Sequence, residues 1–479
     1  MTIKINSTAN YRGSGLAKYQ VRPLIWIIAV ASLVLFVCSS LRHDLFQSTA
    51  FDLGIFDNAV YLISQGKEPI VTFRGLHILG DHGAGILYPL ALLYVLIPNV
   101  HWLFAVQAVS LAAGALPVWY LAIQAKLSQA QAYGIAIAYL LYPVVFNANL
   151  FDFHPEVIAV PFIFLTVWAA RAHKMGWFIV AVAVVLSSKA VLALSVIAIG
   201  IWLILSEKRT IYGVIAIFLG TAWFIIATQI IIPLFSGEEA AAVERYSFLG
   251  DSVTEIATNL IFQPGLVLGN IFTLANLEYL ALLFLPWLWG MSVKHLAPLI
   301  GAMPLLLLNL LTDYPLQKDL IHQYSLPILP FLALSAIATL AASDGWISSR
   351  RAIVTWSVIT WLALAKFGYF GSKYLASIDT RNATKNAISR ILTKEAVLAP
   401  ATVVPHLTHR PIVEVIDNSN LQPNLDRFQY VILNTRHLGL NVNVSLVDNL
   451  LWRLKQTPKF RLDFQADDVY LFSKTDPRP

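Results

Sequence analysis

Long apolar runs separated by short polar segments fill most of the chain up to residue 374. A helix of roughly 20 apolar residues crosses the hydrocarbon core of a bilayer, which is ~30 Å thick. The pattern therefore predicts an all-α polytopic membrane protein with about eleven transmembrane helices, the first over residues 23–41. The apolar run at 86–97 is too short to cross, so it predicts a helix that lies in the interface.

Lys and Arg set the expected direction of these helices, because both are enriched in the cytoplasmic segments of membrane proteins. The tail over residues 1–22 contains basic residues and no acidic ones, so we expect a cytoplasmic N-terminus. Basic residues also follow almost every expected inward end. The other expected spans are 101–123, 133–148, 157–170, 177–186, 191–205, 211–235, a stretch within 266–289, 296–311, 324–342 and 352–370.

After residue 374 the chain becomes polar, mixed in charge and strand-like. We expect residues 375–479 to form a small α/β domain on the outer face, following a transmembrane domain over 23–374. Its expected strands are 401–405, 412–415, 430–434 and 469–473, and its expected helices are 382–399 and 446–456. The outer loops of the transmembrane domain are then 42–100, 149–156, 236–265 and 312–323.

Composition agrees with this class of protein. Of the 479 residues, 57% are hydrophobic and 13% charged, whereas about a quarter of a soluble chain is charged. The net charge of +6 is explained by Lys and Arg in the cytoplasmic segments, so we expect no nucleic-acid partner. The lone Cys38 excludes a disulfide framework and a thiolate metal site.

The stretch over residues 51–89 has an unusual number of ionisable groups for a segment between two membrane helices. They are Asp52, Asp57, Glu68, Arg74, His77, Asp81 and His82. We interpret this stretch as an active-site loop, with an ordinary amphipathic surface helix as the alternative. Asp52 lies at the membrane exit and is expected to face the cleft, with Asp57 capping the helix or facing water.

A second acidic turn, NLFDFHPE, carries Asp152, His154 and Glu156 at alternating positions. Alternation in an extended turn places side chains on one side, which suits a divalent cation or the orientation of a base. These three residues are therefore the candidate metal ligands. The alternative is simple capping of the helix that follows.

A third set of residues is mainly basic and consists of Arg74, His82, Lys189, Arg245, Lys318 and His322. Lys189 interrupts an apolar hairpin, so it requires an anionic partner or a route to the interface by snorkelling. Arg245 and His322 are suited to holding a lipid phosphate, although a solvated loop charge is the default for Arg245 and Lys318. Tyr324 belongs to a set of outer aromatic residues that fits sugar stacking or an interfacial belt.

Five motifs stand out along the chain: FDLGIFDNA, LHILGDHGAGILYPLALLY, FDFHPE, HQYSLPILPFLAL and ATVVPHLTHRPIVEV. They resemble a family of bacterial predicted membrane proteins allied to the GT-C superfamily of polyprenyl-phosphate-sugar glycosyltransferases, which includes protein O-mannosyltransferases and aminoarabinose transferases. The resemblance implies an enzyme of the bacterial plasma membrane that takes a sugar from a polyprenyl-phosphate carrier, with inversion, on the outer face. The acceptor would be a glycan, a lipid or a protein.

By motif match, the resemblance assigns Asp52 as the catalytic base and places Asp152 and Glu156 near the reacting centre or a metal. The HQYSLP stretch, with His322 and Tyr324, corresponds to an element near the lipid phosphate. Two departures stand out: His322 and Gln323 where Arg or Lys is common, and Lys189-Ala190-Val191 where Lys-Glu-Asp is frequent. A transporter or lipid flippase and a non-catalytic scaffold remain the alternatives.

Overall fold

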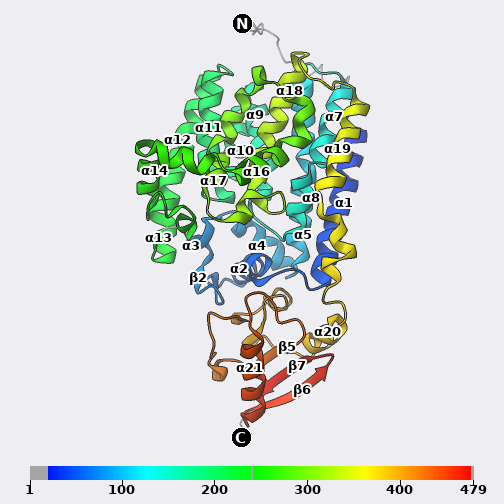
Figure 1. Ribbon diagram of the computed structural model, residues 1–479, viewed down its shortest axis with the longest axis vertical. Coiled ribbons are helices and arrows are strands. Elements are labelled where there is room, and N and C mark those ends of the chain that lie inside the picture. The colour runs from blue at the N-terminus through cyan, green and yellow to red at the C-terminus, as the bar shows by residue number, and fades with distance from the viewer. Residues whose placement is uncertain (1–19, 239–240, 476–479) are drawn as a thin grey trace.

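The computed structural model describes residues 20–238 and 241–475 as a long helical body with a small sheet domain at one end (Figure 1). The predicted cytoplasmic tail over 1–22 lies almost wholly outside the described residues. Helix α1 (Arg22–Asp44) runs along the body and ends beside the sheet domain, where Asp44 pairs with Arg381. We call this the sheet-domain end of the body.

The body is built mainly from helices. After α1 they are α2 (Ile55–Ser64), α3 (Ile78–His82), α4 (Leu87–Leu96), α5 (His101–Ala113), α6 (Ala115–Gln124), α7 (Gln129–Leu140), α8 (Pro143–Leu150), α9 (Glu156–Arg171), α10 (Met175–Ser188), α11 (Leu192–Leu205), α12 (Thr210–Ile226), α13 (Ile232–Ser236), α14 (Val253–Phe262), α15 (Pro264–Ile271), α16 (Leu274–Phe284), α17 (Met303–Leu311), α18 (Leu329–Ala341) and α19 (Arg350–Leu364).

Short helical turns and one small hairpin connect these elements. The turns used below are η2 (Ala50–Gly54), η4 (Ala241–Tyr246), η7 (Ala297–Ala302), η8 (Pro315–Lys318), η9 (Gln323–Ile328), η10 (Lys366–Gly371), η11 (Lys373–Leu375) and η12 (Val404–His406). The hairpin pairs β1 (Ile70–Val71) with β2 (Leu76–His77) in antiparallel fashion. It lies inside the long loop that the sequence singled out.

The predicted spans are helices, but fewer of them meet a length criterion for crossing a membrane. Among the described residues, five are long and apolar enough, and two bent pairs raise the number to seven. The four remaining predicted spans are α9, α10 and α11, of 16, 14 and 14 residues, and the segment Ala297–Leu311. Length and composition thus support at most seven crossings, whereas the hydropathy pattern predicted about eleven.

Glycine allows α11 and α12 to pack closely. A Cβ atom on Gly200 of α11 would lie 2.6 Å from the carbonyl oxygen of Gly213 on α12. Small residues at such crossings let helix backbones approach in a membrane, where the hydrophobic effect between helices is absent. Replacement of Gly200 would therefore push the two helices apart.

The C-terminal domain contains a five-stranded mixed sheet with the order β4-β3-β5-β7-β6. Its elements are α20 (Arg381–Ser389), β3 (Val397–Pro400), β4 (Val413–Ile416), β5 (Tyr430–Asn434), α21 (Val444–Gln456), β6 (Phe460–Ala466) and β7 (Val469–Lys474). Strands β4, β3 and β5 are parallel, and β7 joins β5 and β6 in antiparallel fashion. The α/β class predicted for this region is confirmed.

The two faces of this sheet pack against different partners. Alternation along each strand sends Val397 and Ile432 to one face and Leu398 and Val431 to the other. The first face contacts α20 and reaches Phe46 in the loop after α1. The second face is covered by α21. The sheet therefore buries both faces, and the first of them joins it to the helical body.

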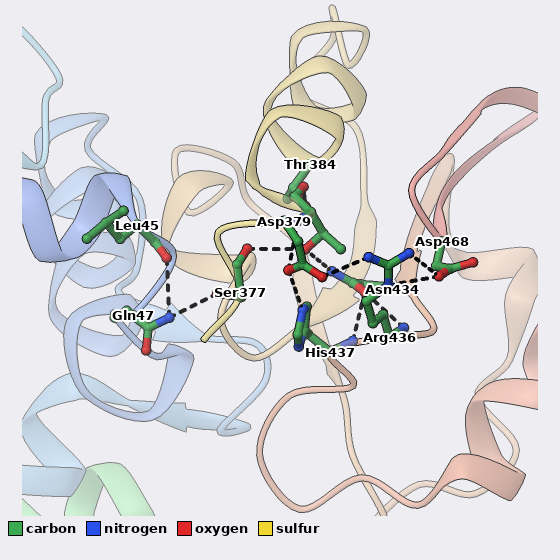
Figure 2. A network of polar contacts seen from close by, with 10 residues as sticks. Leu45, Gln47, Ser377, Asp379, Thr384, Asn434, Arg436, His437 and Asp468 are labelled. Carbon is green, nitrogen blue, oxygen red and sulfur yellow. Dashed lines mark hydrogen bonds and ion pairs between the residues drawn. The ribbon is translucent and has the colours of Figure 1, made fainter. Parts of the chain in front are cut away.

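A polar network also joins the two parts (Figure 2). Gln47 donates to the hydroxyl of Ser377 at 3.0 Å, and Asn434 donates to the hydroxyl of Thr380. Arg436 lies 2.7 Å from Asp379 and lowers the pKa of that carboxyl to about 2. Residues 377–380 therefore contact both the loop after α1 and the sheet domain.

Two predicted elements of the C-terminal domain are wrong in detail. The strand expected at 401–405 is instead a turn followed by η12, and the true strand is β3 at Val397–Pro400. The expected helix at 382–399 is shorter, because α20 ends at Ser389. After β3 the chain leaves the sheet to meet the helical body, where Ala50 donates to the carbonyl of Ala401 at 2.8 Å.

Candidate active site

The two acidic motifs meet at the sheet-domain end of the body. Asp52 lies in η2, a single π-helical turn directly before α2, and Asp152 lies in the turn between α8 and α9. Such π turns are frequent at functional sites. The backbone amide of Thr49 donates to Asp152 at 3.1 Å, and its hydroxyl donates to Asp52 at 3.0 Å. One residue therefore connects the two carboxylates, and the convergence expected from the sequence is present.

Asp152 is buried and paired. Its carboxylate forms an ion pair with Arg42, at the last turn of α1, and both side chains are almost fully enclosed. Its φ of 97° is rare for a residue other than glycine, and such strained backbones cluster at functional sites. Burial raises the pKa of Asp152 to about 6, although Arg42 opposes the shift. The group is therefore mainly ionised at neutral pH and neutralised by Arg42.

Asp52 is more open than its neighbours, with 24% of its side chain exposed. His154 Nε2 lies 3.4 Å from Asp52 Oδ1, whereas the Thr49 hydroxyl donates to the other oxygen, Oδ2. Burial alone would raise the pKa of Asp52, but hydrogen bonds from His154 and Thr49 hold it below the usual value. Asp52 is therefore an ionised carboxylate that solvent or a ligand can reach.

Glu156 and Lys189 form the second buried ion pair. The Lys189 amine lies 2.8 Å from Glu156 Oε1, at the break between α10 and α11. The same amine lies 5.7 Å from the ring centre of Tyr324. Of the two interpretations of Lys189, an anionic partner is thus the one observed.

Arg245 is held by neutral groups. It donates to Gln317 at 3.1 Å and to the hydroxyl of Tyr324 at 3.2 Å, and it lies 4.5 Å from the ring centre of Tyr314. The solvated loop charge is therefore not what the structure shows. Within the described ranges no carboxylate comes within ion-pair distance of Arg245, so its charge remains available to an anion.

His322 connects η9 to the acidic turn. Its Nδ1 lies 2.7 Å from Asp319, and its ring meets the edge of Phe151 with centres 4.1 Å apart. Phe151 stacks on His154 at 5.5 Å, and His154 in turn contacts Asp52. Three rings from two segments, the acidic turn and the start of η9, therefore form a continuous wall beside the open carboxylate.

Arg74, Asp81 and His82 form a third charged group, next to the Lys189 break. His82 Nδ1 lies 2.9 Å from Asp81, and Arg74 lies 3.8 Å from it. Burial opposes ionisation of Asp81, but His82 and Arg74 bring its pKa down to about 2. The carbonyl of His82 accepts a hydrogen bond from Ala190 at 3.1 Å. The loop thereby contacts the α10–α11 break directly.

Asp57 has a different environment from the other predicted site residues. It is fully buried and accepts hydrogen bonds from the hydroxyls of Tyr94 and Thr408, with His409 Nε2 at 3.2 Å. Thr408 and His409 belong to the C-terminal domain. The structure therefore places Asp57 in the joint between the two parts, closed to solvent, rather than at its expected capping or water-facing position.

The three candidate metal ligands do not come together as a ligand set. Asp152 contacts Arg42, His154 contacts Asp52, and Glu156 contacts Lys189. Across residues 20–238 and 241–475, no three His, Cys, Asp or Glu side chains form a group that would hold a metal ion. The arrangement does not fit the cation site considered from the sequence, and dependence on a divalent cation stays a prediction.

Sequence reasoning missed Arg42, Thr49, Thr408 and His409. Arg42 did leave a signal, because a basic residue at the outward end of the first span departs from the positive-inside pattern. Thr49 is an ordinary loop residue by composition. Thr408 and His409 lie inside the quoted tail motif ATVVPHLTHRPIVEV, but their partner Asp57 is about 350 residues away.

The fold matches solved structures of ArnT from Cupriavidus metallidurans. With ArnT bound to undecaprenyl phosphate, the TM-score is 0.59 at 12% sequence identity, covering 95% of this chain and 99% of that chain. With ArnT in the apo state, the TM-score is 0.55 at 12% identity, covering 95% and 98%. No curated protein matches the sequence significantly. The chain therefore has an ArnT-like fold, as its motifs predicted.

A family model provides a second and independent match. It covers residues 42–471, which include the long loop, both acidic motifs and most of the C-terminal domain. Together with the apolar helices, this match identifies an integral membrane protein. The chain belongs to the family described as predicted membrane protein, DUF2079.

Proposed function

We propose that this protein is a membrane glycosyltransferase that moves a sugar from a polyprenyl-phosphate donor to an acceptor on the outer face of a bacterial plasma membrane. The observation that carries the proposal is the open, ionised Asp52 between two closed ion pairs, Arg42–Asp152 and Lys189–Glu156. The shared fold with ArnT supports the class of reaction, and undecaprenyl phosphate bound to ArnT supports the class of carrier.

Asp52 is the proposed general base. Its carboxylate takes the proton of the acceptor hydroxyl as that oxygen attacks the anomeric carbon. The bond from the anomeric carbon to the phosphate oxygen breaks in the same displacement, so the configuration inverts and polyprenyl phosphate leaves. A base with a low pKa is weak, but it is ionised at every working pH and accepts the proton as the bond forms.

Arg245 is the proposed partner of the leaving phosphate. It carries a full charge without a carboxylate partner among the described residues, and Tyr314 and Tyr324 fix its position. Asp52 contributes to raising the pKa of Tyr314, after burial and Tyr324, so the base and Arg245 share one electrostatic environment. A preorganised cation stabilises negative charge that develops in the transition state.

Asp152 and Glu156 are proposed to act close to the reacting centre through their partners. Asp152 orders Arg42 and the Thr49 amide, while Glu156 orders Lys189. Lys189, His154, His322, Tyr324, Arg74 and His82 remain the proposed substrate-binding residues, because they line the same end of the body as Asp52.

The test is transfer or release of sugar from a labelled polyprenyl-phosphate donor by the purified, reconstituted protein. Asp52→Asn is expected to lower the rate by about 10²–10⁴-fold, the range for a lost general base. The matched control is Asp251→Asn, an exposed carboxylate in the loop after η4. No turnover by the wild-type protein, or full activity of Asp52→Asn, would contradict the proposal. Lipid translocation without sugar release would instead indicate the flippase alternative.

A further inference from the structure

A cavity of about 310 Å³ lies beside the candidate active site, between α16, η8 and the end of α19. Its volume is at the lower end of the range for small-molecule sites. Lys318 and Lys366 line it, together with Leu282 and Leu364. The combination of two cations with apolar walls suits an amphiphile that has an anionic head.

Like Arg245, the two lysines lack the carboxylate partner that several other enclosed cations of the body have. Arg42, Lys189 and Arg171 each pair with a carboxylate. For Lys318 and Lys366, no carboxylate lies within ion-pair distance in the part of the chain that the structure describes. Both side chains are partly buried, and burial lowers the pKa of Lys318. An anion beside these lysines would stabilise their charged form.

The acids of this cavity do not supply that anion. Asp319 lines the cavity, but its carboxylate accepts from the amides of Ile321 and His322 and contacts the His322 ring. Glu278 is exposed and pairs with no cation within the described ranges. Asp313 favours the charged form of Lys318 but forms no ion pair with it among the described residues. Lys318 and Lys366 are therefore the half-buried charges of the cavity without an ion pair in the described part of the chain, whereas Glu278 is an exposed one.

The surroundings of the cavity show where its ligand would come from. Helix α16 lines the cavity and also presents Leu274 and Leu277, which are 83% and 56% exposed. Exposed leucines on an apolar helix of a membrane protein face acyl chains rather than water. A lipid tail would lie against these leucines while its head group enters beside Lys318.

We propose that this cavity binds the phosphate head group of a second bilayer lipid, separate from the phosphate that Arg245 is proposed to hold. Lys318 and Lys366 provide charge-assisted hydrogen bonds to the phosphate oxygens. Asp319 connects the cavity to the ring wall through His322, Phe151 and His154. If the proposed function holds, this lipid would be a lipid acceptor or a neighbour of the donor, bound at the far end of the ring wall that leads from Asp52.

The experiment is photo-cross-linking of the full-length protein in nanodiscs with lipids that carry a diazirine in the tail. The probes are phosphatidic acid, polyprenyl phosphate and, as a neutral reference, diacylglycerol. Peptide mapping is expected to find a phosphate-bearing probe on α16 or η10, with labelling reduced about tenfold in the double variant Lys318→Gln/Lys366→Gln. Diacylglycerol labelling is expected to stay unchanged.

Lys373→Gln is the matched control, because Lys373 and Lys366 both lie over the Tyr369 ring but only Lys366 lines the cavity. The variant Lys318→Arg/Lys366→Arg keeps the charges and is expected to keep the labelling, which separates charge from folding. Labelling by one phosphate probe alone identifies the source, and either probe supports a lipid-phosphate site. Equal labelling of the double variant and wild type, or equal labelling by diacylglycerol, overturns the proposal.

Asp52→Asn separates this inference from the proposed function. That variant is expected to keep full labelling of α16 or η10 while it loses transfer. If transfer fails but labelling persists, only the proposed function is contradicted. If labelling fails but transfer persists, only the lipid site is contradicted.

Discussion

Asp52 and Asp57 lie on one short stretch of chain but in opposite environments. Asp52 keeps 24% of its side chain exposed and has Thr49 and His154 as partners. Asp57 keeps 1% exposed and has three donors, two of them from the C-terminal domain. Both carboxylates have a lowered pKa, so ionisation alone does not identify a functional group. Access does distinguish them, because only the Asp52 side chain is partly exposed.

The difference arises from what covers each turn of the helix. Asn58, next to Asp57, donates to the carbonyls of Thr408 and Arg410, so the C-terminal segment closes over this part of α2. Asp52 precedes α2, in the π turn, and stays at the edge of that cover. The C-terminal domain therefore holds the loop in place without closing the candidate active site.

Removing Arg42 is the largest expected perturbation, because it leaves Asp152 buried without its cation. Arg42→Gln is expected to lower the free energy of unfolding by about 3–5 kcal/mol, the usual cost of breaking a buried ion pair. Denaturant unfolding of the protein in detergent measures this loss. The control is Arg42→Lys, which keeps the charge and is expected to lose less than Arg42→Gln.

The pH dependence of stability tests the same pair. Burial raises the folded-state pKa of Asp152 to about 6, above a value near 4 in the unfolded chain. Between ~4 and ~6 the folded state binds more protons, so this group's contribution to the free energy of unfolding falls as pH rises and is constant above that window. The loss of unfolding free energy caused by Arg42→Gln is therefore expected to be smaller at acidic pH, where Asp152 is protonated. A deficit that is constant with pH would show that Asp152 is not the cause.

Asp57→Asn is expected to lower stability, whereas Asp52→Asn is expected to lower turnover. Asp57 accepts from Tyr94, Thr408 and His409, and hydrogen bonds to a charged group contribute about 1.5–3 kcal/mol. We expect Asp57→Asn to lower the free energy of unfolding by about 2 kcal/mol, with little change in transfer per folded molecule. Full stability combined with lost transfer would place Asp57 in the chemistry instead.

Thr408→Val tests the joint from the side of the C-terminal domain, with a smaller effect. It removes one hydroxyl donor to Asp57 and keeps the shape of the side chain, so a loss of about 1–2 kcal/mol is expected. The lowered pKa of Asp57 stabilises the fold above the unfolded pKa, and that contribution disappears as pH falls through the folded value. Thr408→Val is therefore expected to match wild type more closely in acid than at neutral pH.

The helical body and the two acidic turns were predictable, because apolar length and clustered charge are local properties of the sequence. FDLGIFDNA and FDFHPE indicated Asp52 and Asp152, and the structure brings both to the same end of the body. The closed state of Asp57 was not predictable, since its cover comes from a segment about 350 residues away. Residues 401–405 have a strand-like pattern, but they lie outside the sheet, where Ala401 accepts a hydrogen bond from Ala50. This contact is also distant in the sequence, so the local pattern could not predict it.

His154 gives the smallest expected effect, and it tests whether access alone separates Asp52 from Asp57. His154→Phe keeps a ring against Phe151 and Phe56 but removes the donor that faces Asp52. Asp52 would stay open and ionised but lose one of its two orienting partners. Hydrogen-bond partners of this kind hold a reacting group in its working orientation. We therefore expect kcat to fall about tenfold with the donor KM unchanged, and His154→Gln, which keeps a donor, to recover part of the rate. A rise in KM without a change in kcat would show that His154 binds the donor rather than positions the base. An unchanged rate would show that Thr49 and the open surroundings of Asp52 are enough.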